Sequence, residues 1–434
     1  MNLMNLKPTA PLGGFVELLP AQQRFVDASI ETMRDIARRA GFEHIDLPAI
    51  ERAEVLTDET DWSETATQMF LFQKGDTKMG LRYDGTVGLA RFVAGNMNDL
   101  NFPCRLTQFS KRYRGERPQK GRYREFYQMD FDILGIGGLS ANYDAEIIKL
   151  VADIYKALPE VFGEYVINIG SRTFWNELAK YLGLTKDQIE KVFVLIDRRL
   201  KLEAEDWKNG MTEAAGNENG AIILSVFSDG YEKFMGKAPK LDRAITELKE
   251  VMALLDSMGV KAAKLDLGTM RGLGYYDGIV YEAISMTYPE LGSIGGGGRY
   301  GNLVGRFSKT QIIGSGYAIG TNRALITALE RMDLSRYKTA VDVAVLIIGQ
   351  ESVAYAMKIL SELRDNDIVA VPYLDVDKKF KNQMEFADKI NCKFSIIIGE
   401  DEVKSNTLTI KDMASGEQKQ ATLSKAINVV KSDR

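Results

Sequence analysis

Residues 112–128 read Arg-Tyr-Arg-Gly-Glu-Arg-Pro-Gln-Lys-Gly-Arg-Tyr-Arg-Glu-Phe-Tyr-Gln, a dense run of cations around an Arg-Pro-Gln turn. Between Lys111 and Arg124 seven basic side chains stand against one acid, Glu116. Arginine supplies a planar fork of N–H donors that matches phosphate oxygens. The stretch therefore predicts a β-hairpin that binds an anion, with phosphate as the expected target. Taken alone, it leaves open the alternative of a solvated basic hairpin.

Composition excludes several classes of protein. The 434 residues are 45% hydrophobic and 27% charged, which is ordinary for two or three globular domains. The net charge of -4 indicates that any contact with nucleic acid is local. The one histidine, His44, lies in a strand-like segment away from any paired signature, which excludes a Ser-His-Asp triad and a His-rich zinc site.

Cysteine usage and hydropathy predict the compartment. Cys104 and Cys392 lie far apart without metal-ligand spacing, so we expect free thiols in a reducing environment. No stretch approaches the roughly 18 consecutive apolar residues that span a bilayer. The N-terminal sequence lacks the pattern of a secretion signal. We therefore expect a cytoplasmic protein without a membrane segment.

Hydrophobic periodicity predicts an α+β fold in which an antiparallel sheet is flanked by helices and interrupted by a helical insertion. The expected helices of this part are 21–40, 143–157, 174–182, 186–202, 240–258 and 320–332. The expected strands are 43–50, 79–83, 105–114, 123–134, 264–267, 279–285, 294–299 and 314–319. This pattern assigns 1–170 and 260–332 to one core and 171–259 to the insertion.

The chain from 338 to 434 alternates strand and helix, which predicts a separate α/β domain. Its expected strands are 341–348, 368–373, 394–398 and 407–411, and its expected helices are 352–364 and 378–390. Four lysines give this domain a local basic patch that a solvated helix face would explain almost as well: Lys378, Lys379, Lys381 and Lys389.

Three motifs carry a resemblance to a known family. The hairpin resembles the second signature motif of class II aminoacyl-tRNA synthetases, and its sequence is similar to that of histidyl-tRNA synthetases in particular. Met270-Arg271-Gly272-Leu273-Gly274-Tyr275-Tyr276 resembles the first histidine-specific motif of that family, and Gly296-Gly297-Gly298-Arg299-Tyr300 resembles the second. The resemblance runs from about Pro11 to the C-terminus.

The resemblance implies a class II catalytic core and a C-terminal anticodon-binding domain. The implied function is a ligase that activates L-histidine with ATP and Mg²⁺ and transfers it to the 3′ end of tRNA(His). The implied assembly is a homodimer, with 43–50 at the interface. In such a reaction two anionic groups must be held together, which is a task for fixed arginines.

The same resemblance implies roles for individual residues. Arg114 and Arg271 would be the catalytic cations. ATP would be bound by Arg114, Glu116, Phe126 and Arg323. Histidine would be bound by Asp84, Thr86, Gln128, Asp132, Arg271, Tyr275 and Tyr276, the first three at the ammonium group. The acceptor end of tRNA would meet Arg117, Gln119 and Arg122. Glycines 295–298 would let a strand pass close beneath the substrate.

The sequence departs from the family pattern at several positions. The family usually has acids where Gly274, Gly301 and Asn322 stand, which leaves the metal ligands unknown because carboxylates are the usual magnesium ligands. Ser110-Lys111-Arg112 replaces a more apolar entry to the hairpin.

Two rival functions stay open at this point. One is a non-catalytic, histidine-sensing regulatory subunit of ATP phosphoribosyltransferase, and the other is a tRNA-binding module with a decayed site. The regulatory subunit normally lacks an anticodon-type domain, whereas 341–430 is intact here.

Overall fold

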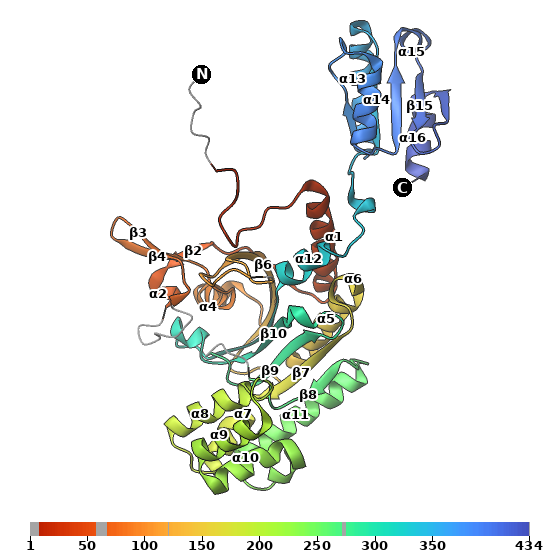
Figure 1. Cartoon of the computed structure of the whole chain (residues 1–434). Coiled ribbons are helices and arrows are strands. Elements are labelled where there is room, and N and C mark those ends of the chain that lie inside the picture. Colours follow the sequence, from red (N-terminus) through yellow and green to blue (C-terminus); the bar gives the residue numbers. More distant parts are fainter. Residues whose placement is uncertain (1–7, 58–66, 120, 271–274, 434) are drawn as a thin grey trace. The chain divides into compact units, whose positions relative to one another are not determined.

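The computed structural model describes residues 8–57, 67–119, 121–270 and 275–433 (Figure 1). Contacts divide the chain into two compact units. The larger unit includes Ala28–Met332, and the smaller one combines Leu18–Asp27 with the chain from Asp333 onward. Helix α1 (Pro20–Arg39) therefore contributes residues to both.

An eight-stranded sheet forms the centre of the larger unit as described. Neighbouring strands are antiparallel except at the two edges, where β1 pairs with β5 and β7 with β8 in parallel. The expected antiparallel sheet is confirmed, and pairing between β6 and β11 joins its two sequence halves. In sheet order the strands are β1 (Glu43–His44), β5 (Cys104–Tyr113), β6 (Glu125–Ile136), β11 (Ile312–Ile319), β10 (Ser293–Tyr300), β9 (Ile279–Ser285), β7 (Tyr165–Ser171) and β8 (Ala263–Leu265).

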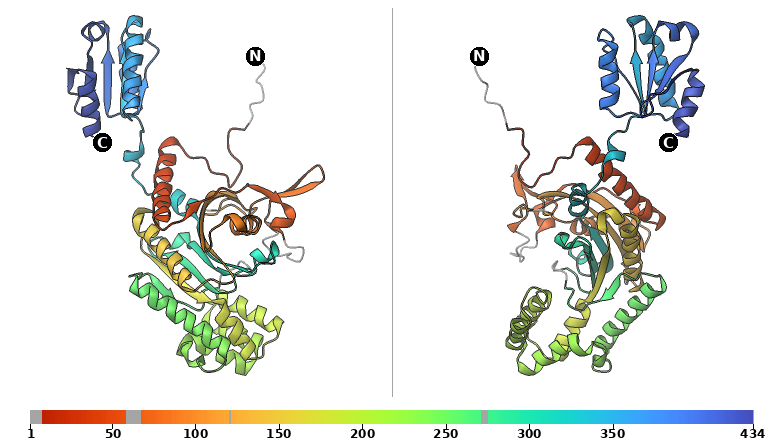
Figure 2. Two further views of the ribbon diagram at one scale, coloured as in Figure 1. Left: turned by 180° about the vertical axis from the view of Figure 1, so that it is seen from behind. Right: turned by 45° about the vertical axis from the view of Figure 1, so that its right-hand side comes forward.

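Helices with one apolar side cover this sheet. Helix α5 (Asn142–Ala157) packs against β11 through a fully buried row that includes Ile147, Val151 and Ile154. Its spacing of three or four residues is that of one helix face. Helix α1 lies on the same side, as both views in Figure 2 show. The short helix α6 (Pro159–Phe162) packs against α5, and α12 (Thr321–Leu329) packs against α6 and β6. Helix α4 (Thr86–Gly95) packs within the curve of the sheet.

Five helices occupy the stretch between β7 and β8 that the sequence assigned to an insertion. Thr185 and Gln188 form a capping box at the start of α8, and Pro239 begins α11, so local sequence fixes both helix starts. The helices are α7 (Arg172–Tyr181), α8 (Lys186–Asp197), α9 (Ala204–Ala215), α10 (Asn217–Asp229) and α11 (Pro239–Ser257).

The strand expected over 43–50 is two strands in two different sheets, so this expectation was wrong. The chain leaves the large sheet after β1 and enters a small sheet at β2 (Ile50–Arg52), because Pro48 between them cannot donate to a ladder. The small sheet is completed by β4 (Thr77–Leu81) and β3 (Leu71–Lys74), and α2 (Ala53–Leu56) packs on β4.

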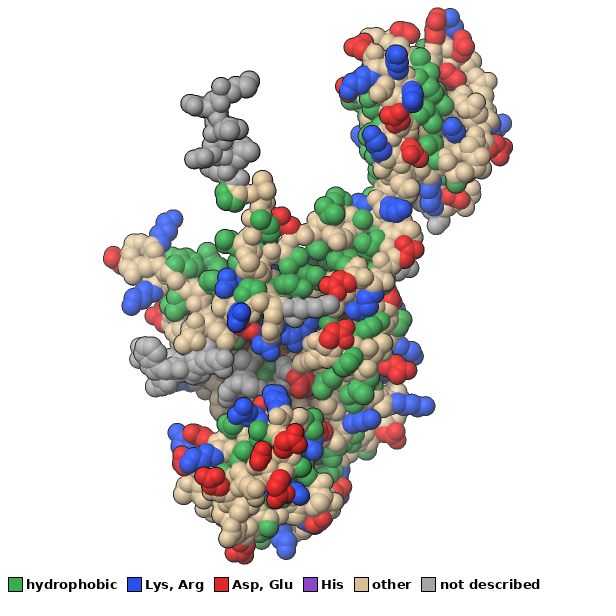
Figure 3. Space-filling view, in the orientation of Figure 1, with side chains coloured by type: hydrophobic (Ala, Val, Ile, Leu, Met, Phe, Trp, Pro, Cys, Tyr) green, Lys and Arg blue, Asp and Glu red, His purple; other side chains and the backbone are tan. Residues whose placement is uncertain are grey.

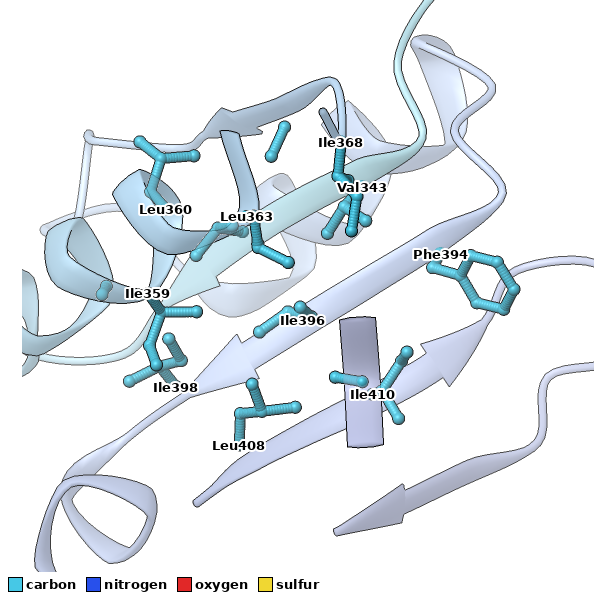
Figure 4. Packing of buried hydrophobic residues seen from close by; sticks show 14 of the residues in the cluster. Val343, Ile359, Leu360, Leu363, Ile368, Phe394, Ile396, Ile398, Leu408 and Ile410 are labelled. Carbon is cyan, nitrogen blue, oxygen red and sulfur yellow. The ribbon is translucent and has the colours of Figure 1, made fainter. Parts of the chain in front are cut away.

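The smaller unit is a five-stranded mixed sheet with helices on both faces. Alternate residues of strand β12 enter opposite cores: Val343, Val345 and Ile347 face α13 (Val353–Asp365) and α16 (Leu423–Ser432), while Ala344 and Leu346 face α14 (Phe380–Lys389). Figure 4 shows the first of these cores, in which Val343 and Leu363 are labelled. In sheet order its strands are β13 (Ala370–Pro372), β12 (Val343–Ile347), β14 (Phe394–Ile398), β15 (Leu408–Asp412) and β16 (Gln418–Ala421). Its helices are α13 (Val353–Asp365), α14 (Phe380–Lys389), α15 (Glu400–Ser405) and α16 (Leu423–Ser432). The expected α/β domain is confirmed.

Hydropathy of the helices bears on the membrane question. Over the ranges that the structure describes, none of the helices combines the length and the apolar content that crossing a bilayer requires.

Candidate active site

The arginine-rich stretch forms the predicted hairpin between β5 and β6. Tyr113 pairs with Glu125 at its base, and the backbones of Gln119 and Arg122 exchange hydrogen bonds of 2.8 and 3.2 Å near its tip. Two distant segments hold the loop. The carbonyl of Gly14 accepts from the Arg124 amide at 2.8 Å, and the carbonyl of Gln68 accepts from the Gly115 amide at 2.7 Å.

A pocket opens between this hairpin and strands β10 and β11. Its lining includes four residues expected to bind ATP, together with one expected to bind histidine: Arg114, Glu116, Phe126, Arg323 and Gln128. Figure 3 shows Lys and Arg side chains gathered near the middle of this face of the larger unit. The structure thus brings together residues that lie far apart in the sequence.

Arg114 is held between two aromatic rings. Its guanidinium carbon lies 4.5 Å from the ring centre of Tyr83 and 5.1 Å from that of Phe126. A cation over a ring face is attracted by the ring quadrupole, so the two rings fix the guanidinium in place. Preorganisation of this kind is what binding of a phosphate or carboxylate in a fixed position requires.

Arg323 closes the opposite side of the pocket. Its Nε donates to the Gly121 carbonyl at 3.0 Å and its Nη1 donates to the Ser293 carbonyl at 2.7 Å, so it ties the hairpin loop to β10. Glu116 accepts from Arg122 at 3.3 Å at the exposed rim. Arg117 and Gln119 are also exposed on the loop, as residues that contact a macromolecule must be.

A second, smaller pocket lies further along β6. Thr86, Asp130, Asp132, Tyr276 and Tyr300 are among its lining residues. The Tyr300 hydroxyl donates to Asp132 Oδ1 at 2.8 Å, and the Asp132 side chain is buried. Burial raises the pKa of Asp132 well above its usual range, and the nearby charge of Asp130 raises it further.

The turn before α4 reaches the same region. Asp84 accepts from the Val87 amide at 3.1 Å with one oxygen and from the Tyr275 hydroxyl at 3.3 Å with the other. Burial raises the pKa of Tyr275 well above its usual value, and the charge of Asp84 adds to that rise. Tyr275 therefore acts as a hydrogen-bond donor rather than as an anion.

Alternation along β6 connects the two pockets. Gln128, Asp130 and Asp132 are two residues apart, so their side chains project from the same face of the strand. Gln128 lies in the first pocket and the two acids lie in the second. Its Oε1 atom is buried and accepts no hydrogen bond from the residues that the structure describes. An acceptor of this kind suits a ligand that donates.

Glycines allow the acids to occupy this face. A Cβ at Gly316 would lie 2.0 Å from Asp132 Oδ1, and one at Gly314 would lie 2.2 Å from the Tyr300 ring. Glycines 295–298 were expected to let a strand pass close beneath the substrate, but the structure gives Gly297 a different reason to lack a side chain. A Cβ at Gly297 would lie 1.9 Å from the Gly316 carbonyl oxygen, which reflects close packing between β10 and β11, whereas Gly295 lines the first pocket.

Some expected residues lie outside the described part, and some residues around the second pocket were not expected there. Arg271 and the departure at Gly274 fall outside the described residues. Sequence analysis gave no role to Tyr300, Asp130 or Arg112, which the structure places in or beneath the second pocket. The available signal was the spacing Gln-x-Asp-x-Asp, which predicts three acceptors on one strand face.

The donor set does not fit a magnesium ion caged by the protein. Among the described residues no group of three His, Cys, Asp or Glu side chains is arranged around a metal position. The Asn322 side-chain oxygen accepts from the Tyr127 amide at 3.1 Å, so it supports the backbone of β6 instead. Glu116 is the one carboxylate in the described lining of the first pocket. Magnesium prefers octahedral oxygen ligands, including carboxylates and phosphates.

An antiparallel sheet that carries an arginine hairpin over adjoining anion and acid pockets, with a separate α/β domain, defines a class II aminoacyl-tRNA synthetase. The model of the family described as histidyl-tRNA synthetase matches 14–324, and the model of the anticodon binding domain matches 342–433. The chain belongs to the histidyl-tRNA synthetase family.

Relatives of similar length support this membership. The histidine–tRNA ligase of Clostridium tetani is 36% identical over 440 aligned residues, which cover 98% of both chains. That of Treponema denticola is 30% identical, again with 98% of both chains covered. The crystal structure of histidyl-tRNA synthetase from Nostoc sp. superposes with a TM-score of 0.84 at 27% identity, covering 99% of this chain and 100% of the other.

The raised pKa of Asp132 predicts a pH-dependent cost in stability. Because the native carboxyl holds its proton more tightly than the unfolded one, the fold loses stability as pH rises from about 3.9 through the native pKa. Asp132→Asn removes this loss. We therefore expect it to stabilise the protein more at pH 8 than at pH 4.5.

Denaturant midpoints measured at the two pH values check this. Asp256→Asn, at an exposed site on α11, controls for the loss of one charge. An equal effect of Asp132→Asn at both pH values would contradict the assignment.

Proposed function

We propose that the chain is a histidine–tRNA ligase. A carboxylate oxygen of histidine attacks the α-phosphorus of ATP and pyrophosphate leaves. The 3′-terminal ribose hydroxyl of tRNA(His) then attacks the carbonyl of the adenylate and AMP leaves. The observation that carries this proposal is the pair of adjoining pockets on one face of β6, one with cations for a phosphate and one with acids for a basic side chain.

Arg114 is the residue to which we assign the α-phosphate and the substrate carboxylate. Both groups are anionic, so bringing them together requires a fixed cation, and charge that builds on phosphorus needs the same cation more strongly. Tyr83 and Phe126 hold Arg114 before the ligands arrive, which avoids reorganisation during the reaction. We assign the second cationic role to Arg271 on the resemblance of its motif.

The first pocket provides the surfaces that adenine needs. Phe126 offers a ring face for stacking, Arg323 offers a guanidinium on the other side, and Glu116 offers an acceptor for the exocyclic amino group. Magnesium enters in this proposal as the ion that ATP brings on its phosphates, because the described protein groups do not form a cage for it.

The acids on the other side bind the amino acid. Asp84, Thr86 and the buried Gln128 oxygen are acceptors suited to an ammonium group. Asp132, with Tyr275, Tyr276 and Tyr300 around it, is suited to an imidazole ring. A site that pairs the polar atoms of its substrate rejects apolar mimics by about 10⁴–10⁵, since unpaired buried groups are costly.

The tRNA contacts are assigned to two places. Arg117, Gln119 and Arg122 present charge and base-reading groups at the tip of the hairpin, which suits the acceptor end. The domain at 338–434 is assigned to the anticodon. Its expected lysine patch is weakened because Lys378 lies 2.9 Å from Asp375 and Lys381 lies 4.0 Å from Glu385, so part of the charge is neutralised locally.

We further infer a homodimer in the cytoplasm. The small sheet exposes apolar side chains, with Ile50 at 47%, Leu71 at 50% and Phe72 at 41% accessible, as an unpaired interface would. This surface adjoins the segment whose motif implies dimerisation. Both cysteines are free and buried, which suits a reducing compartment. Sedimentation equilibrium at micromolar concentration should give twice the chain mass, and a monomer would contradict the inference.

Arg114→Ala provides a direct test of the activation step. We expect histidine-dependent pyrophosphate exchange to fall by roughly 100- to 1,000-fold, the scale for losing one preorganised charge donor. Arg38→Ala removes an exposed arginine on α1 and should leave the rate unchanged. Full exchange by the Arg114 variant would remove this residue from the mechanism, and absence of exchange in the unmodified protein would refute the ligase itself.

A chain that ends at Lys338 tests the anticodon assignment. This end keeps the ring contact between Phe25 and Tyr337 at 5.5 Å and the bonds from Arg24 to the carbonyls of Tyr337 and Lys338 at 2.7 and 2.6 Å. We expect pyrophosphate exchange to persist while charging of tRNA(His) falls at least tenfold, because the removed part supplies the remote binding energy. Charging at the full rate by the folded truncation would show the assignment to be wrong.

A further inference from the structure

One of the two rings that hold Arg114 lies outside the large sheet. Tyr83 is buried in the segment that joins β4 to α4. The backbone before it is fixed from β5, because the Tyr113 amide donates to the Arg82 carbonyl at 3.0 Å. A backbone contact does not set the direction of a side chain, whose first torsion has three staggered positions. A contact at the outer end of the ring can select one of them.

Gln68 makes that contact. Its Oε1 atom accepts from the Tyr83 hydroxyl at 3.1 Å. The phenol oxygen is the side-chain atom farthest from the backbone, so a hydrogen bond at this atom opposes rotation of the whole ring. The guanidinium carbon of Arg114 lies 4.5 Å from the centre of the same ring, and its Nε donates to the Tyr83 carbonyl at 3.4 Å. The direction of the ring therefore bears directly on the position of the cation.

Gln68 also binds the backbone next to Arg114. Its carbonyl accepts from the Gly115 amide at 2.7 Å. A Cβ at Gly115 would lie 3.1 Å from this oxygen, so the absence of a side chain allows the two segments to approach closely. One residue thus contacts two supports of Arg114, the ring beside its guanidinium and the peptide that follows it in the chain.

Gln68 acts at a distance from the ligands. The first pocket is lined by Arg114 and Phe126, whereas Gln68 is not part of its described lining. Phe126 belongs to β6, where it lies opposite Arg112 in the ladder with β5, so its position is set by the large sheet. Tyr83 has no place in that ladder. An effect of Gln68 on the reaction must therefore pass through Tyr83 and Arg114.

Resting on the proposed function, we infer that Gln68 is a positioning residue for the activation of histidine, because it fixes the Tyr83 ring and the Gly115 peptide that hold Arg114 toward the α-phosphate. A preorganised charge stabilises a transition state without reorganising during the reaction. Loss of the Gln68 side chain keeps the charge of Arg114 but lets it move. The consequence is a slower chemical step with little change in ground-state binding.

Gln68→Leu tests this inference in the full-length protein, because it removes the side-chain acceptor and keeps the backbone carbonyl. We expect kcat of histidine-dependent pyrophosphate exchange to fall about 3- to 10-fold, the scale of one hydrogen bond, while KM for ATP and for histidine changes by less than about twofold. Tyr83→Phe removes the same bond from its other end and keeps the ring, so it should lower kcat by a similar factor. The double variant should be no slower than either single one, since one bond is lost in all three.

The Arg114→Ala background separates positioning from a general structural role. With the guanidinium absent, Gln68→Leu has no cation to position, so it should change the residual exchange rate by less than about twofold. A residue that only stabilises the fold would lower exchange by the same factor in both backgrounds. The matched control is Gln188→Leu, which removes the Oε1 atom that accepts from the Thr185 amide at 3.0 Å at the start of α8. It loses a local hydrogen bond of the same kind and should leave kcat unchanged.

The possible results lead to different conclusions. An unchanged kcat in a folded Gln68→Leu protein would overturn the inference, and an equal fall in both backgrounds would make Gln68 a structural residue and overturn it as well. If Gln68→Leu does not fold, Tyr83→Phe decides, because it tests the same bond without altering residue 68, and an unchanged kcat there would also overturn the inference. Failure of the unmodified protein to support histidine-dependent exchange would refute the proposed function instead.

Discussion

The pairing of β6 with β11 is the constraint on which the larger unit depends. It joins two halves of the sheet that are separated by the entire helical insertion, with Asp132 opposite Gly316 in the register. A shift of one residue would turn every side chain of β6 to the other face, which would remove Gln128, Asp130 and Asp132 from the site together. Glycines at 314 and 316 make this register compatible with Tyr300 and Asp132, because any Cβ there would overlap them. The sheet and the site are therefore specified by the same contacts.

The electrostatics of the two pockets follow from their position on this sheet. One pocket has cations fixed by aromatic rings and backbone carbonyls, and the other has acids whose pKa values burial raises. Burial of Asp130 and Asp132 opposes folding, so the hydrophobic core around α5 and the β9–β11 strands must offset it. Such destabilising groups are expected at sites that bind a substrate by its polar atoms. This cost in folding free energy comes from the loss of hydration of two carboxylates on one strand face.

Sequence patterns predicted most of this arrangement, and the failures have physical causes. Long periodic segments such as α5, α11, β6 and β9 were predicted within two residues of their bounds. Strand β7 (Tyr165–Ser171) was missed although Gly163 ends the preceding helix α6, because its place in the sheet depends on pairing with the distant strand β9. The burial of Arg112 could not be predicted from its place in a basic run. Only the fold shows that this arginine, unlike its neighbours on the hairpin, points inward and is fully buried.

The two-unit organisation bears on the choice between an enzyme and a histidine sensor. A protein that binds histidine without catalysis requires the acid pocket. It does not require a fixed cation at an α-phosphate or a domain that binds an anticodon. This chain has Arg114 held between Tyr83 and Phe126, and it has a complete five-stranded unit with its own buried core. Both features lie outside the acid pocket, and both are accounted for by a ligase that must hold ATP and tRNA as well as histidine.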